Sequence, residues 1–140
     1  MARKTVAELM SPAPIALRPD APLIEAAIQM REHGIGDVLV AEDGQLKGLI
    51  TDRDLVVRGM AGGKDPGSTP IAELCSKDLV TVAPGDDATV AVRRMRVTAV
   101  RRVPVVDDGR AVGVVSIGDM ALERDEASAL AEISAERPNA

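Results

Sequence analysis

The sequence predicts an α/β (α+β) protein made of two β-α-β-β-α repeats that pack on each other as a pseudo-two-fold pair. The chain repeats itself at an offset of 65 residues, so that residues 6–59 align without a gap onto 71–124. Hydrophobic periodicity also changes in the same order along both copies, which predicts a shared secondary structure. One copy alone is too small to bury both its sheet and its helices, so we expect the two to form one domain.

Identical residues at this offset are spread over the whole alignment, for example Pro19/Pro84, Ala26/Ala91, Met30/Met95, Gly48/Gly113 and Asp54/Asp119. A Gly- and Pro-rich stretch separates the copies and is typical of a linker. We therefore divide the chain into four parts: a first repeat at 5–62, a linker at 63–70, a second repeat at 71–126, and a C-terminal helix and tail at 127–140.

Each copy opens with a short apolar run that predicts a strand, at 15–17 and at 79–82. Apolar residues at helical spacing follow, and Gly34 is expected to end the first of these helices. Next come two apolar runs around an Asp-Gly dipeptide, at 43–44 and 108–109, which predict tight hairpins. A second helix should begin near Asp52 and near Ile117. Short helices are expected to precede each copy, over TVAELM and IAELC.

Composition restricts the class of protein. Phe, Tyr and Trp are absent, so aliphatic residues and Met must build the core and grip any ligand base. The net charge of −5 argues against nucleic acid, whose phosphates need a basic stripe. No apolar run approaches the ~20 residues that span a bilayer, no signal peptide is apparent, and Cys75 has no cysteine partner. We expect a reduced, cytoplasmic protein without a membrane partner.

The most informative motif is Gly-h-x-[Thr/Ser]-x-x-Asp, where h is hydrophobic. It occurs at Gly48, Thr51 and Asp54 and recurs in the second copy at Gly113, Ser116 and Asp119. A hydroxyl followed three residues later by an acid, between a strand and a helix, is typical of a helix N-cap worth ~1 kcal/mol. On its own the motif favours this structural interpretation.

Two observations favour a ligand instead. A glycine in mid-strand loses packing and conformational entropy, which a helix cap does not require but close approach of another molecule does. A helix N-terminus suits a phosphate, and a carboxylate such as Asp54 can accept two hydrogen bonds from a ribose diol. The motif chemistry therefore suits a nucleoside phosphate.

Together these features resemble the paired cystathionine-β-synthase (CBS) domains, often called a Bateman module. The resemblance covers about residues 5–125 and is carried by the duplicated element order, by LMSPAPIALRPDAPLIEAAIQM and LCSKDLVTVAPGDDATVAVRRM, and by GLITDRDL and GVVSIGDM. It implies that adenosine-type ligands (AMP, ADP, ATP or S-adenosylmethionine) bind in clefts between the repeats. It also implies a homodimer of disc-like shape.

In such pairs each cleft combines the Thr/Ser and Asp of one repeat with strand residues of the other. The resemblance implies one cleft formed by Gly48, Thr51, Arg53, Asp54, Val80, Thr81, Val82, Arg101, Arg102, Val103 and Pro104. It implies a second cleft formed by Ile15, Ala16, Leu17, Gly36, Asp37, Val38, Gly113, Ser116 and Asp119.

The two clefts are expected to differ in charge. Arg101 and Arg102 stand at the start of the second hairpin, where arginine can bind phosphate in a bidentate manner. The aligned residues of the first repeat are Gly36 and Asp37, and an acid repels phosphate. We predict that the Asp54 cleft is the nucleotide site and that the Asp119 cleft is the weaker one.

Other candidates are better explained by structure. His33 stands at a helix end and has no second histidine for a metal pair, Cys75 suits an apolar core, and Asp107-Asp108 suits a turn. No nucleophile, base and oxyanion donors occur together, so we expect neither catalysis nor a required cofactor nor a metal.

The leading hypothesis is a non-catalytic sensor that binds AMP, ADP or ATP between the repeats and signals by a conformational shift to an unknown protein partner. The alternative is a structural or protein-interaction module whose nucleotide sites are vestigial.

Overall fold

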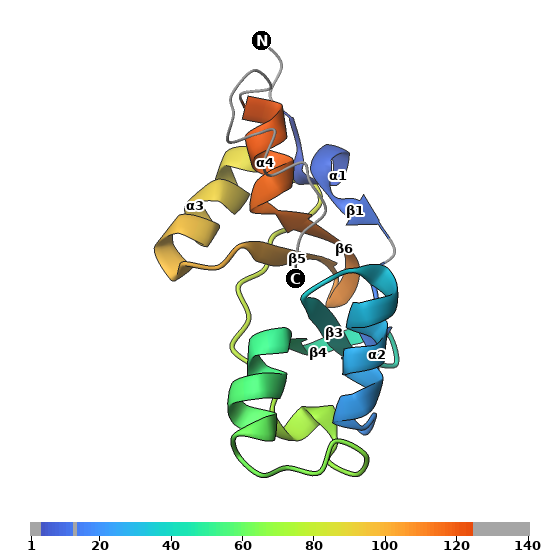
Figure 1. The fold of residues 1–140 in the computed structure, drawn as a ribbon. Helices are drawn as coiled ribbons and strands as arrows, with labels where there is room; N and C mark the ends of the chain where they lie inside the picture. The colour runs from blue at the N-terminus through green and yellow to red at the C-terminus, as the bar shows by residue number, and fades with distance from the viewer. Residues whose placement is uncertain (1–3, 13, 125–140) are drawn as a thin grey trace. The chain divides into compact units, whose positions relative to one another are not determined.

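The computed structural model describes residues 4–12 and 14–124, which form two compact units (Figure 1). The first-repeat unit comprises residues 15–79, and the second-repeat unit joins the described residues before 15 to residues 80–124. The helix and tail expected at 127–140 lie outside the described residues. Each unit is described by itself.

The first-repeat unit has the predicted β-α-β-β-α order. Strand β2 (Ala16–Leu17) runs parallel to β3 (Asp37–Glu42), and β3 pairs antiparallel with β4 (Gln45–Thr51). Helix α2 (Leu23–His33) lies between β2 and β3 in the chain. The π-helix η1 (Asp54–Met60) follows β4, and the 3₁₀-helix η2 (Ile71–Glu73) is the expected short helix over IAELC. The hairpin turn is Asp43-Gly44, with φ of 54° and 81°, as its sequence predicts.

The second-repeat unit contains α1 (Val6–Leu9), β1 (Ser11–Pro12), α3 (Ala88–Thr98), β5 (Arg102–Asp107), β6 (Arg110–Ser116) and α4 (Ile117–Arg124). Strand β6 pairs antiparallel with both β5 and β1. The turn at Asp108-Gly109 repeats that of the first hairpin, with φ of 54° and 79°. The mixed α/β fold predicted from the sequence is thus confirmed in both units.

The prediction of a strand over residues 79–82 is wrong in its length. A single bridge, between Val82 and Val105, forms in this segment. In the first repeat the amide of Leu39 donates to the Ile15 carbonyl at 3.0 Å. The residue aligned with Leu39 is Pro104, which has no N–H to donate. The second repeat therefore lacks the ladder bond that would extend the strand.

The segment that leads each repeat packs in the unit of the other repeat. We call residues 6–12 and the equivalent residues 71–77 the lead segments. The Val6 amide donates to the Asp86 carbonyl at 2.8 Å, and the Ile71 amide donates to the Ala21 carbonyl at 2.8 Å. These two bonds are equivalent under the offset of 65 residues. The compact units therefore exchange the lead segments that the sequence repeats contain.

Two equivalent helices end in the left-handed conformation. Gly34 ends α2 with φ 63°, as predicted, and its amide donates to the Met30 carbonyl. The aligned residue Ala99 ends α3 with φ 57°, although alanine strains this conformation. Glycine at the first site and alanine at the second therefore hold the same turn at different conformational cost.

Aliphatic residues and methionine build the core of each unit, as the absence of aromatic residues requires. In the first-repeat unit the cluster is formed by Leu23, Ala26, Met30, Val38, Val40, Ile50, Ile71, Leu74 and Cys75. In the second-repeat unit it is formed by Val6, Val82, Ala91, Met95, Val103, Val105, Val115 and Met120. Ile71 and Val6, which belong to the exchanged lead segments, are fully buried. These segments are therefore structural parts of the units that receive them.

The segment between the repeats is folded around Asp65. Its carboxylate accepts hydrogen bonds from the Gly67 amide at 3.0 Å and from the Ser68 hydroxyl at 2.9 Å. These bonds lower the pKa of Asp65, the one from the Gly67 amide most of all. The Pro66 carbonyl in turn accepts from the Ile24 amide in the first turn of α2. The predicted linker thus packs against the first repeat.

Candidate functional site

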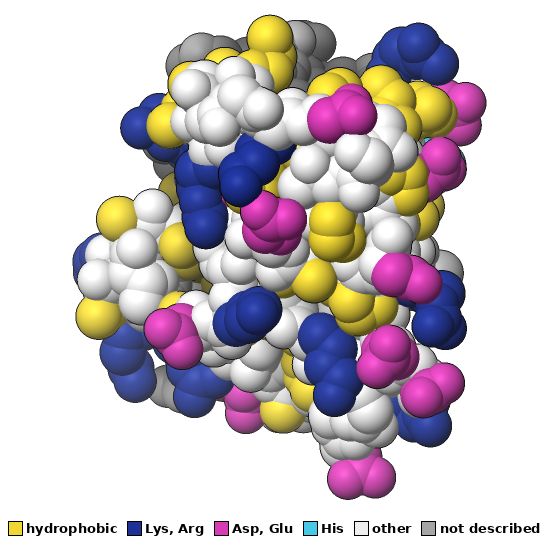
Figure 2. All heavy atoms as spheres, turned by 90° about the horizontal axis from the view of Figure 1, so that it is seen from below, with side chains coloured by type: hydrophobic (Ala, Val, Ile, Leu, Met, Phe, Trp, Pro, Cys, Tyr) yellow, Lys and Arg dark blue, Asp and Glu magenta, His cyan; other side chains and the backbone are white. Residues whose placement is uncertain are grey.

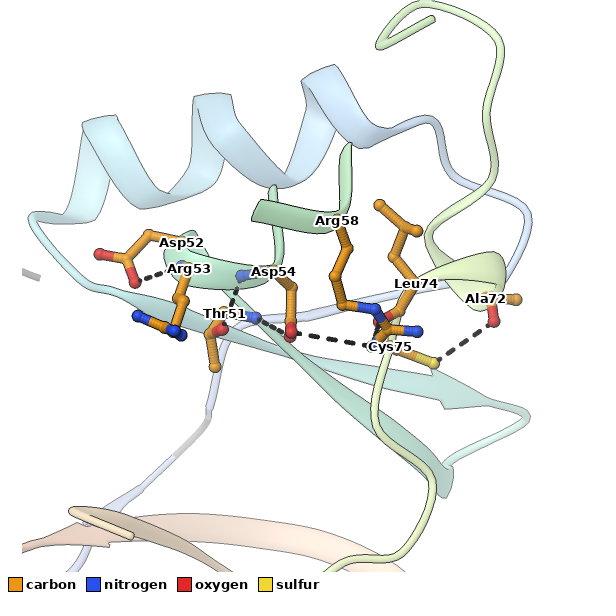
Figure 3. Close-up of polar contacts among 8 residues, drawn as sticks. All are labelled: Thr51, Asp52, Arg53, Asp54, Arg58, Ala72, Leu74 and Cys75. Atoms are coloured by element: carbon orange, nitrogen blue, oxygen red, sulfur yellow. Dashed lines mark hydrogen bonds and ion pairs between the residues drawn. The ribbon is translucent and has the colours of Figure 1, made fainter. Parts of the chain in front are cut away.

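The junction between β4 and η1 carries the first copy of the motif. The Thr51 amide donates to Asp54 Oδ2 at 2.9 Å, and the Asp54 amide donates to Thr51 Oγ1 at 3.1 Å (Figure 3). The two residues therefore cap the helix start reciprocally. The Asp54 side chain is 16% exposed, so its carboxylate still borders solvent.

The junction between β6 and α4 repeats this geometry. The Ser116 amide donates to Asp119 Oδ2 at 2.8 Å, and the Asp119 amide donates to Ser116 Oγ at 3.2 Å. The capping interpretation of the motif is thus confirmed at both copies. Because a carboxylate has about four acceptor sites, each aspartate retains sites for further hydrogen bonds.

The motif glycines are explained by the chain itself. A Cβ on Gly48 would lie 2.8 Å from Cys75 Sγ and 2.8 Å from the Ser76 carbonyl oxygen. A Cβ on Gly113 would lie 2.5 Å from Met10 Sδ and 2.8 Å from the Ser11 carbonyl oxygen. The close approach expected from these glycines is therefore that of a lead segment, and they do not by themselves point to a ligand.

The other predicted residues of the first repeat lie beside this junction. Asp37 stands opposite Thr51 in the sheet, and the Gly36 carbonyl accepts from the Asp52 amide at 2.9 Å. Val38 is buried in the core, and Ile15, Ala16 and Leu17 run along β3. Members of both predicted clefts thus meet at one end of the β3–β4 hairpin.

The second repeat shows the same arrangement. Arg102 stands opposite Ser116, and the Arg101 carbonyl accepts from the Ile117 amide at 2.8 Å. The remaining predicted residues lie nearby: Val82 donates its amide to Pro104, Val103 is buried, Val80 packs on the core, and the Thr81 carbonyl accepts from Arg94. The two arginines therefore neighbour Ser116 in their own unit, and their approach to Asp54 stays a prediction.

Two arginines follow Thr51, Arg53 just before η1 and Arg58 within it, and only Arg53 was anticipated. Arg53 is exposed, and its amide donates to Asp52 Oδ1 at 2.8 Å. Arg58, which the sequence analysis missed, lies with Nη1 3.8 Å from Asp54 Oδ1 and donates to the Leu74 carbonyl at 2.7 Å (Figure 3). An arginine four residues after an aspartate on a helix was the available signal.

Cys75 is a buried core residue, as predicted. Its Sγ donates to the Ala72 carbonyl at 3.7 Å, and burial raises the pKa of the thiol above its ordinary value of 9.0. Neutral, buried thiols are poor nucleophiles. The side chain therefore contributes packing.

Several further expectations concern metals, membranes and surface charge. Within residues 4–12 and 14–124, no group of three or more His, Cys, Asp and Glu side chains could hold a metal ion. No helix in that part of the chain is long and apolar enough to cross a bilayer. Figure 2 shows one face of the molecule, on which basic and acidic side chains of the described residues are intermixed.

The two units define a class of protein: a duplicated α/β pair in which each repeat ends its hairpin with a hydroxyl–carboxylate junction. The CBS domain family matches residues 6–59 and 71–125. The chain therefore belongs to the CBS domain family, as a tandem CBS domain pair.

Relatives support this membership. The CBS domain-containing protein YhcV of Bacillus subtilis is 37% identical over 134 residues, which cover 93% of this chain and 95% of YhcV. The CBS domain protein PAE2072 of Pyrobaculum aerophilum, complexed with AMP, is 27% identical with a TM-score of 0.78, over 86% of this chain and 93% of that one. The CBS domain pair of protein MJ0100, in complex with 5'-methylthioadenosine and S-adenosyl-L-methionine, is 25% identical with a TM-score of 0.81, over 91% of this chain and all of that one.

Proposed function

We propose that this protein is a non-catalytic sensor that binds an adenosine-type ligand and that Asp54 accepts hydrogen bonds from the ribose hydroxyls. The observation that carries the proposal is the Thr51–Asp54 junction. There the carboxylate is fixed in place by the Thr51 amide while it still borders solvent. The AMP and S-adenosylmethionine complexes of the related CBS proteins support this choice of ligand class.

The phosphate end of the ligand is assigned to Arg101 and Arg102. The Arg101 side chain is exposed, and among the described residues it forms no hydrogen bond or ion pair. A guanidinium without a partner is available for a charge-assisted bond to a phosphate. The first repeat offers Gly36 and Asp37 at the aligned positions, so we propose the Asp54 cleft as the nucleotide site and the Asp119 cleft as the weaker one.

The second candidate function is a protein-interaction module with empty sites. It is favoured by the two reciprocal caps, since the bonds within Thr51–Asp54 and Ser116–Asp119 give the motif a structural role without a ligand. The lead segments also account for Gly48 and Gly113. Only binding measurements separate these functions.

The test is thermal unfolding followed by circular dichroism, with and without AMP, ADP, ATP and S-adenosylmethionine. A ligand at about 100 times its Kd stabilises the folded state by ~2.7 kcal/mol, which shifts Tm by several degrees. Asp54→Asn keeps an oxygen that can accept from the Thr51 amide but removes the charge, so we expect the shift to disappear. Asp119→Asn is the matched control and should keep it. A wild-type protein that shows no shift with any of the four ligands would favour the interaction module.

We also propose that the protein is a homodimer and that a separate protein reads its conformational shift. Both units expose large apolar side chains on helices, namely Val56 and Met60 on η1 and Val97 and Ile117 on α3 and α4. Exposed apolar side chains at such a density favour association. Light scattering after gel filtration should give twice the chain mass of 14.6 kDa, and a monomer at micromolar concentration would contradict the dimer.

A further inference from the structure

We propose that Arg58 is a positioning residue that couples the Asp54 carboxylate to the segment Leu74–Ser76. The inference deepens the proposed function, because it rests on Asp54 as a ligand-binding group. It assigns a route by which a ligand at the first junction would act on the start of the second repeat.

One guanidinium nitrogen makes both contacts. Arg58 Nη1 lies 3.8 Å from Asp54 Oδ1 and donates to the Leu74 carbonyl oxygen at 2.7 Å (Figure 3). The hydrogen bond to the carbonyl is short and directional, whereas the ion pair is long and the Arg58 side chain is 49% exposed. The carbonyl therefore fixes the guanidinium more firmly than the carboxylate does. The position of the charge beside Asp54 consequently depends on where Leu74 lies.

Leu74 is held by a docked segment. Just after it, the Ser76 amide donates to the Leu49 carbonyl at 2.9 Å, and the Leu49 amide donates to the Ser76 carbonyl at 3.0 Å. Cys75, between them, packs over Gly48, and both Leu74 and Cys75 belong to the buried core. These contacts place the segment against β4, the strand that ends at Thr51. The Arg58 side chain thus joins the motif carboxylate to the segment that is docked on the same strand.

The second repeat provides an internal comparison. There Ser11 pairs with Val114 as Ser76 pairs with Leu49, and Met10 lies over Gly113 as Cys75 lies over Gly48. The residue four positions after Asp119 is Glu123, where the first repeat has Arg58. The lead segment is therefore docked in both repeats, but at the position four residues after the motif aspartate the first repeat has a cation and the second has an acid.

A second contact of the same segment provides a control. Lys64 Nζ lies 2.7 Å from Glu73 Oε1, and Glu73 is the residue before Leu74. This ion pair does not involve Asp54. Lys64→Met removes an ion pair whose lysine is about as exposed as Arg58, and it leaves both contacts of Arg58 in place. If Arg58 carries the coupling, removing the Asp54 charge should speed amide exchange at Ser76 while Arg58 is present. The same change should have no further effect once Arg58 is removed.

The first experiment needs no ligand. Amide hydrogen exchange at Ser76, measured by NMR, is compared in Asp54→Asn, Arg58→Met and the double variant. Arg58→Met should speed exchange several-fold and Asp54→Asn by a smaller factor, and the double variant should exchange no faster than Arg58→Met alone. In the Lys64→Met background, Asp54→Asn should still have its full effect. Multiplicative effects of Asp54→Asn and Arg58→Met would overturn the coupling.

The second experiment adds AMP to the full chain. In the wild-type protein AMP should change Ser76 exchange several-fold, and Arg58→Met should bind AMP within about tenfold of wild type by calorimetry while losing that change. A variant that binds AMP and keeps the change overturns the coupling but not the proposed function. A wild-type protein that does not bind AMP argues against AMP as the ligand, and the ligand-free comparison then decides the coupling.

Discussion

The α-carbon of Gly48 lies directly beneath Cys75, so closely that a Cβ at this position would stand 2.8 Å from the Cys75 sulfur. The same relationship joins Gly113 to Met10 in the other unit. Each repeat therefore uses its mid-strand glycine to receive the lead segment of the other repeat. The duplicated sequence therefore repeats the contact between glycine and lead segment as well as the fold of each unit.

Alanine at these glycines should destabilise the fold. The Cβ of Gly48→Ala would overlap the Ser76 carbonyl, and that of Gly113→Ala would overlap the Ser11 carbonyl, so backbone would have to move. Overpacking of this kind costs ~1–3 kcal/mol in the free energy of unfolding. Urea unfolding followed by circular dichroism measures the loss. Gly85→Ala is the control, because its Cβ would meet no atom within 4 Å, and its change should stay below about 1 kcal/mol.

The two helix ends predict changes of opposite sign. Gly34 and Ala99 share a left-handed conformation, with φ of 63° and 57°. A residue with a Cβ costs roughly 1–2 kcal/mol in that conformation, partly offset by the smaller entropy loss on folding. Gly34→Ala should therefore destabilise the fold by about 1 kcal/mol, and Ala99→Gly should stabilise it by about 0.5–1 kcal/mol. Thermal unfolding of both variants checks this, and an equal sign for the two would contradict the explanation.

Much of this architecture was predictable, because the offset of 65 residues let each copy confirm the other. The turns at Asp43-Gly44 and Asp108-Gly109 and the end of α2 at Gly34 follow from residues that tolerate positive φ. The reciprocal caps at Thr51 and Ser116 follow from the spacing of the motif. All of these are local signals, which the sequence states directly.

The features that sequence reasoning missed are long-range. Nothing near residue 48 in the chain indicates that Cys75 packs over it, so the glycine suggested a ligand. The shortened strand at Val82 depends on the missing amide of Pro104, which lies 22 residues further along the chain. Arg58 was visible as the fourth residue after Asp54, but its bond to Leu74 spans 16 residues and requires the fold.

Removing a cap hydroxyl should cost stability in either unit. In Thr51→Ala the Asp54 amide loses its acceptor at 3.1 Å, and in Ser116→Ala the Asp119 amide loses its acceptor at 3.2 Å. Each change should lower the free energy of unfolding by ~0.5–2 kcal/mol. Thr51→Ser and Ser116→Thr retain a hydroxyl and serve as matched controls in the same urea titrations. If the alanine and hydroxyl variants were equally stable, the caps would not contribute.

The buried Cys75 thiol predicts a pH dependence in the alkaline range. Burial, the largest cause, raises the pKa of Cys75 above 9.0 in the folded state, while the unfolded chain titrates near 9.0. Below pH 9 both states hold the proton, so the thiol adds its full contribution to stability. Above pH 9 the unfolded state loses the proton first, and the free energy of unfolding falls by at most ~1.4 kcal/mol per pH unit until the folded thiol also ionises.

Urea unfolding of the wild-type protein and of Cys75→Ala between pH 7 and 10.5 isolates this contribution, since other titrating groups are common to both. The difference in stability between the two should be constant up to pH 8 and then shrink; a difference that stays constant to pH 10.5 would mean that the thiol ionises as easily in the folded protein as in the unfolded chain.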